Sequence, residues 1–167
     1  MNYVEYRTKL KDSLDAYFNV MLNKEVINKK FDLFANFNSR NARYMLSKKA
    51  EIYAYKSNEY VFYNNIETII DIETLESMKN FLIENVDNII EIDNEHMSSL
   101  INVIYTVNGG ITEEIKKKIK KFSFYKSYKF GFRGWVNTRL VVIDLSSNEI
   151  YTNKLARKEG KKFFFKN

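Results

Sequence analysis

The chain has 167 residues, enough for one domain and short for two, with 16% aromatic residues and a net charge of +6. It has no Cys and no Pro, which excludes disulfides, thiolate nucleophiles, thiolate metal sites and Pro-rich linkers. The charge is uneven: residues 1–110 hold 12 Lys or Arg and 16 Asp or Glu, a net of −4, whereas residues 111–167 hold 15 and 5, a net of +10. We therefore expect a single domain over residues 1–167 with a basic C-terminal third.

The first half of the chain predicts one helix followed by strands. Apolar residues recur at three- and four-residue steps over residues 3–22, which is typical of an amphipathic helix. From Phe31 to Phe37 the period changes to two, which predicts a strand. Residues 43–56 and 60–63 predict a hairpin around a turn at residues 57–59.

The second half alternates helices and strands. Helices are predicted at 72–91 and 113–121, with Asp71 and Thr112 as N-caps, and a buried strand at 99–107. Strands at 135–145 and 149–152 follow, and residues 161–166 form either a last strand or a basic tail. The predicted fold is α+β: a mixed, mostly antiparallel sheet of about six strands with three helices, in the order α-β-β-β-α-β-α-β-β.

The ends and the uncharged stretches favour a cytoplasmic protein with no membrane partner. Charged residues from Glu5 onward leave no apolar core for a signal peptide. The longest stretch without a charge, residues 97–112, is too short and too polar to span a bilayer.

The basic C-terminal third suggests the first functional hypothesis, a binding face for a polyanion such as nucleic acid. Cations contact phosphates and aromatic rings stack on bases. The residues expected to form this face are Lys126, Lys129, Arg133, Trp135 and Arg139, with Arg40 and Arg43 as neighbours. The alternative is a sheet whose rings face the core and whose lysines face water. On the binding hypothesis the protein is a non-enzymatic module with no cofactor and no assignable catalytic residue.

Two other hypotheses remain open: an enzyme, with a metal site or a nuclease site, and a homo-oligomer. Glu95 and His96 are weak candidates for a metal site, because residues so close in sequence diverge on a helix or strand. A degenerate or divergent metal-dependent nuclease of the restriction-endonuclease type would use an acid on one strand and an acid-x-Lys on the next. Asp32, Glu51 and Lys56 stand in that order, but four residues separate Glu51 from Lys56. The third hypothesis is a homo-oligomer formed through exposed Tyr and Phe.

Several short segments carry a family resemblance, including Ser39-Arg40-Asn41, Glu95 to Ser99, and Phe130-Gly131-Phe132-Arg133-Gly134-Trp135. Through them the sequence resembles a family of small bacterial proteins of unknown function. The resemblance covers most of the chain and implies a bacterial origin and a cytoplasmic location. It implies no activity and assigns no functional residue.

Overall fold

One mixed sheet organises the protein. The computed structural model describes the backbone of residues 1–44 and 51–165, and their side chains except those of residues 40–55. Within the described residues the elements are α1 (Tyr3–Leu14), β1 (Asn19–Val26), β2 (Lys29–Tyr44), β3 (Glu51–Ile66), α2 (Ile72–Ile89), β4 (His96–Val107), α3 (Glu113–Lys121), β5 (Tyr125–Ser127), the 3₁₀ turn η1 (Lys129–Gly131), β6 (Trp135–Asp144), β7 (Glu149–Thr152) and the 3₁₀ turn η2 (Glu159–Phe163).

The sheet confirms the predicted α+β class. Its described strands are seven, in the order β1-β2-β3-β4-β6-β5, with β7 also paired to β6. β3 pairs with β4 in parallel, and so does β4 with β6, whereas the remaining pairs are antiparallel. The parallel steps are crossovers made through α2 and α3, as such connections require.

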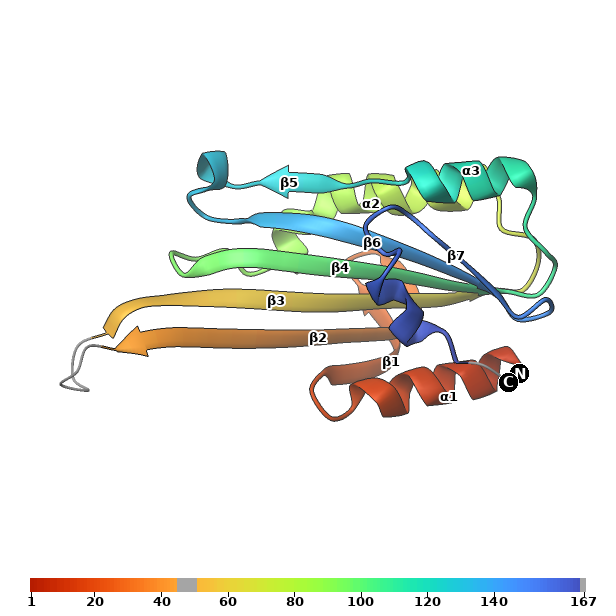
Figure 1. Cartoon of the computed structure of the whole chain (residues 1–167), viewed down its shortest axis with the longest axis horizontal. Coiled ribbons are helices and arrows are strands. Elements are labelled where there is room, and N and C mark those ends of the chain that lie inside the picture. The colour runs from red at the N-terminus through yellow and green to blue at the C-terminus, as the bar shows by residue number, and fades with distance from the viewer. Residues whose placement is uncertain (45–50, 166–167) are drawn as a thin grey trace.

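Each face of the sheet carries its own hydrophobic core. α2 and α3 cover one face, where Phe62, Met78 and Leu82 are buried. α1 and η2 lie on the other face over Leu33, Tyr63 and Ile104. The Tyr6 hydroxyl of α1 donates to the carbonyl oxygen of Phe163 at 2.8 Å, so the two ends of the chain meet on this face (Figure 1).

Two boundaries differ from the sequence prediction. The first helix ends at Leu14, not at residue 22, because residues 19–26 pair with β2 as strand β1. The predicted turn at residues 57–59 lies inside β3, where Ser57 and Glu59 are half-buried and Asn58 is buried. The polarity of Ser57 and Glu59 reflects hydrogen bonds to Ser98, Asn102 and Lys162, not a turn. Of the tail at 161–166, residues 161–163 belong to η2 and not to a strand.

The N-caps were predicted correctly. The Asp71 carboxylate accepts from the Thr74 N–H at 2.8 Å, and the Thr112 hydroxyl accepts from the Ile115 N–H at 3.3 Å. None of the helices among the described residues has the length and apolar character needed to cross a bilayer.

The long strands reach beyond the helix that covers them. In Figure 1, α1 lies beneath the right-hand part of β2 and β3, and the left-hand part extends past it. On this face Leu33, Val61 and Ile104 are fully buried, whereas Ser57, Leu100 and Trp135, nearer the other end of the strands, are only partly covered. Among the described residues, this end of the α1 face is thus a partly open sheet surface, which we call the open part of the α1 face.

Candidate polyanion-binding site

The edge of β6 is divided between two short strands. On the side of β6 away from β4, β5 pairs with residues 135–137 and β7 pairs with residues 141–144, so residues 138–140 have no described strand beside them on that side. Asn153, which follows β7, fills the gap: its Oδ1 accepts from the Leu140 N–H at 3.1 Å and its Nδ2 donates to the Thr138 carbonyl oxygen at 2.9 Å. The Asn153 backbone N–H also donates to the Leu140 carbonyl oxygen at 3.1 Å.

Asn153 also fixes the segments on both sides of the gap. Its Nδ2 donates to the Phe122 carbonyl oxygen at 3.1 Å, and its Oδ1 accepts from the Ala156 N–H at 3.1 Å. The side chain is only 2% exposed, so water cannot replace these contacts. One amide therefore holds the end of α3, strand β6 and the segment after β7 around a common point.

A cavity of about 780 Å³ opens at this point. Five exposed cations line it: Lys120, Lys121, Lys154, Arg157 and Lys158. Glu159 is the one carboxylate among the lining residues. Within the part of the chain that the structure describes, no ion pair is formed by any of the five cations. We call this cavity, with its five cations and Thr138, the basic pocket.

Thr138 contributes a neutral donor to the basic pocket. Its side chain is 1% exposed and its Oγ1 has no hydrogen-bond partner among the described residues. A buried hydroxyl without a partner costs free energy, and most buried polar groups in proteins are hydrogen-bonded. Thr138 is among the residues that line the basic pocket, and its hydroxyl lies beneath the pocket's exposed surface.

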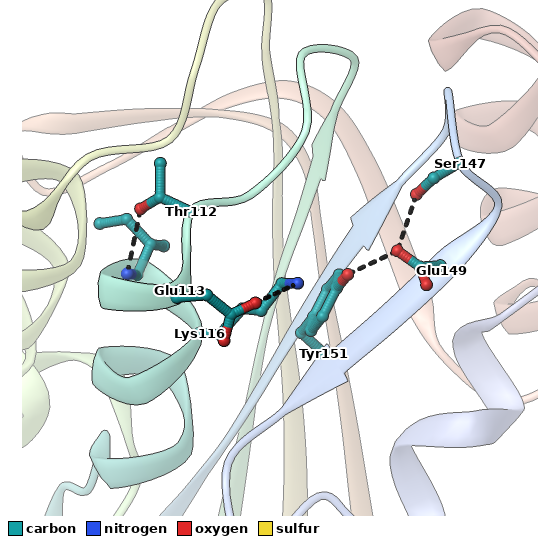
Figure 2. A network of polar contacts seen from close by, with 7 residues as sticks. Thr112, Glu113, Lys116, Ser147, Glu149 and Tyr151 are labelled. Atoms are coloured by element: carbon teal, nitrogen blue, oxygen red, sulfur yellow. Dashed lines mark hydrogen bonds and ion pairs between the residues drawn. The ribbon is translucent and has the colours of Figure 1, made fainter.

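A polar network at the start of α3 orients the helix. Figure 2 shows Lys116 between Glu113 and Tyr151, with Glu149 and Ser147 beyond. Lys116 Nζ lies 2.8 Å from Glu113 Oε1 and 5.0 Å from the centre of the Tyr151 ring, and the Tyr151 hydroxyl donates to Glu149 at 2.6 Å. The hydrogen bond from Lys116 lowers the pKa of Glu113, and that from Tyr151 lowers the pKa of Glu149. Lys116 is thus engaged at β7, while Lys120 and Lys121, a turn later, line the pocket.

The predicted basic face is split by the alternation of the strands. Lys126 pairs in register with Val136, so it lies on the α2 face, whereas Trp135 and Arg139 lie on the α1 face. Lys126 Nζ contacts both oxygens of Asp87 on α2, at 2.6 and 2.8 Å, and the Tyr128 hydroxyl donates to the same carboxylate. The hydrogen bond from Lys126 lowers the pKa of Asp87.

The other predicted residues have separate surroundings. Arg133 donates to Asn94 Oδ1 at 2.6 Å, and Lys129 is exposed in η1 with a φ of 45°. Arg40 and Arg43 lie on β2, paired with Lys56 and Tyr53, and their side chains fall outside the described ones. Of the predicted residues whose side chains the structure describes, Trp135 and Arg139 are therefore the two that are brought together.

Trp135 and Arg139 line a second cavity, of about 440 Å³, on the open part of the α1 face. We call it the open groove. Glu59 lies at its floor: it accepts from Asn102 at 2.8 Å and from Lys162 at 3.0 Å, and its Oε1 is 4.0 Å from Arg139 Nη1. The charges of this groove are paired with one another, unlike those of the basic pocket.

The weak metal candidates have structural surroundings. His96 is buried, its Nδ1 lies 2.6 Å from the Arg133 carbonyl oxygen, and its Nε2 lies 2.9 Å from Ser99 Oγ. Both ring nitrogens thus have protein partners, and Glu95 accepts from the Lys56 N–H through its backbone oxygen. A search of the described residues finds no group of three or more His, Asp or Glu that could hold a metal ion.

The residues of the nuclease pattern are spread along the sheet. Asp32 lies beside Asn64 and Asn65, and its carboxylate accepts from the Asn65 N–H at 2.7 Å. Lys56 forms an ion pair with Asp93 at the other end of β3. Eight residues of strand separate Lys56 from Asn64, roughly 26 Å. The Glu51 side chain lies outside the described ones.

The cations of the basic pocket were not chosen from the sequence. Lys120 and Lys121 belong to a lysine-rich helix whose exposed face is normally explained by solvation. Lys154, Arg157 and Lys158 follow β7 in a stretch without periodicity, which the Asn153 contacts and the packing of Ala156 hold against β6. The net charge of +10 over residues 111–167 was the feature of the sequence that pointed to these five cations.

By its fold and its candidate site the protein is a one-sheet α+β domain with a basic pocket at the edge of β6. Residues 2–166 match a domain of unknown function (DUF8052), and the chain belongs to that family. The search of curated proteins and the search of solved structures found no match.

Proposed function

We propose that this protein is a cytoplasmic, non-enzymatic module that binds a polyanion such as nucleic acid in the basic pocket. The observation that carries the proposal is the convergence of five cations without ion pairs, among the described residues, around the unpartnered hydroxyl of Thr138. Lysine and arginine neutralise phosphates by point charge and by paired N–H donors, respectively. The surrounding backbone is held by Asn153, so the cations are attached to a fixed frame.

The location of the pocket supports the proposal. Residues 67–95, which hold nine Asp or Glu and one Lys, include α2, and α2 covers one face of the sheet. The pocket lies at the β6 edge between β5 and β7. Of the twelve residues that line the pocket, Glu159 alone is acidic. Cations thus outnumber acids five to one among the lining residues.

Fluorescence anisotropy with a labelled, short oligothymidylate tests the proposal. Five phosphate contacts predict that the affinity falls on the order of 100-fold between about 50 and 200 mM salt. Binding that is unchanged across this range, or no binding at about 50 mM salt, would contradict it.

Self-association is a second candidate function, favoured by a different observation. Phe130 and Phe132 are 101% and 89% exposed on the loop between β5 and β6. Rings so exposed are a possible self-complementary contact. Sedimentation velocity at increasing concentration tests it: a dimer that Phe130→Ala with Phe132→Ala abolishes supports self-association, and a monomer throughout rejects it.

A further inference from the structure

The open groove and the basic pocket are adjacent cavities, and Asn137 and Leu155 line both. On β6, Trp135 and Asn137 project from the α1 face two residues apart, roughly 7 Å, whereas Thr138 projects from the other face. A strand-like ligand that occupies both cavities would therefore pass over Asn137 and Leu155 at the sheet edge.

The open groove differs from the pocket in its chemistry. Its apolar lining is Phe37, Leu100, Trp135 and Leu155, and Ser57 and Ser98 form a polar row beside it. The Ser98 hydroxyl donates to Ser57 Oγ at 3.2 Å. Glu59 and Arg139 are the charged residues among those that line the groove, and both belong to the cluster with Asn102 and Lys162. The groove thus offers apolar area and hydrogen-bonding groups without unpaired charge.

The backbone that carries Trp135 into the groove is fixed. It is 39% exposed, at the start of β6, in register with Ser98 of β4. The preceding residue must be Gly: Gly134 has a φ of +77°, and a Cβ on it would lie 2.2 Å from the Met97 carbonyl oxygen. The close approach of these two backbones fixes the point from which Trp135 projects.

We propose that the polyanion is single-stranded nucleic acid, with phosphates in the basic pocket and a base stacked on Trp135 in the open groove. This inference rests on the proposed function, since it identifies the ligand of the same site. Stacking requires a free base face, which a single strand presents and a duplex keeps inside its own stack. A polyanion without bases would fill the pocket and leave the groove empty.

The chain has one Trp, so its fluorescence reports on the groove alone. Titration with the oligothymidylate should quench the Trp135 emission. Inorganic polyphosphate should bind, displacing labelled oligothymidylate, but should leave the emission unchanged. A duplex carrying the same sequence should bind without quenching it.

Trp135→Ala provides the matched test by anisotropy. Loss of one stacked base predicts about tenfold weaker binding of the oligothymidylate. Competition by polyphosphate should be unaffected, which shows that the variant is folded. Oligothymidylate that binds without quenching Trp135, and equally well to Trp135→Ala, would overturn the inference while the proposed function stands. If neither ligand binds, the proposed function fails as well.

Discussion

Asn153 bonds to Leu140 through both its side chain and its backbone. The side-chain oxygen accepts from the Leu140 N–H, and the backbone N–H donates to the Leu140 carbonyl oxygen, each at 3.1 Å. A single residue thus replaces the strand that β6 lacks between β5 and β7. The same gap in pairing creates the space where the basic pocket opens. The stability of this edge and the proposed binding site therefore have one structural origin.

Removing the Asn153 amide should destabilise the protein strongly. Asn153→Ala leaves the Leu140 N–H and the Thr138 and Phe122 carbonyl oxygens without side-chain partners in a buried place. We expect a loss of about 3 kcal/mol in the free energy of unfolding, measured by urea denaturation. Asn80→Ala, at an exposed position of α2, is the control and should change it by less than about 0.5 kcal/mol. Equal effects for the two variants would contradict the assigned role.

The Thr138→Val variant should bind the oligothymidylate more weakly without a loss of stability. Thr138→Val keeps the shape of the side chain and removes a buried hydroxyl that has no partner among the described residues. The free energy of unfolding should therefore be unchanged or higher, since no hydrogen bond is lost. Oligothymidylate affinity should fall about fivefold, because the anion loses one donor. Unchanged affinity in a folded variant would show that the hydroxyl does not face the ligand.

The ion pair between Asp87 and Lys126 predicts a pH dependence. The pKa of Asp87 is lowered, chiefly by the hydrogen bond from Lys126, so the pair stabilises the protein when the carboxylate is ionised. The contribution is complete above the unfolded-state pKa, about 4, and disappears as the pH falls through the lower folded-state value. The stability gap between the unmodified protein and Asp87→Asn should therefore narrow from pH 6 to pH 2.

A double variant checks the partner in this pair. In a Lys126→Met background, Asp87→Asn should produce a smaller gap at pH 6, because the main cause of the lowered pKa is absent. An undiminished gap would assign the effect to other neighbours of Asp87, such as the Tyr128 hydroxyl.

The elements that the sequence predicted well are those whose signals are local. α3 begins and ends as predicted because Thr112 caps it and its apolar residues, Ile115 and Ile119, recur at helical spacing. β1 was missed because Phe18 and Met21 also fit the helical spacing that starts at Tyr6. Its pairing with β2 over residues 19–26 is a tertiary contact that outweighs this pattern.

From the sequence we predicted that the candidate site is basic, and we identified two of the residues near it. Trp135 and Arg139 were selected and share a face of β6, but Lys126 lies on the opposite face of the sheet. The pocket cations after β7 depend on Asn153, whose long-range contacts leave no periodic trace. The spacing of residues within one strand does not show where a later segment of the chain packs against that strand.

The salt dependence of oligothymidylate binding, compared between two triple variants, tests the central claim most directly. The pocket variant changes Lys154, Arg157 and Lys158 to Gln. The control changes Lys9 on α1, Lys24 on the opposite edge strand β1 and Lys30 on β2, all exposed, and removes the same charge. We predict that the slope of log affinity against log salt decreases in magnitude by about 2 for the pocket variant, as three lost phosphate contacts require, and stays unchanged for the control. Equal slopes for the two variants would contradict a binding site at the basic pocket.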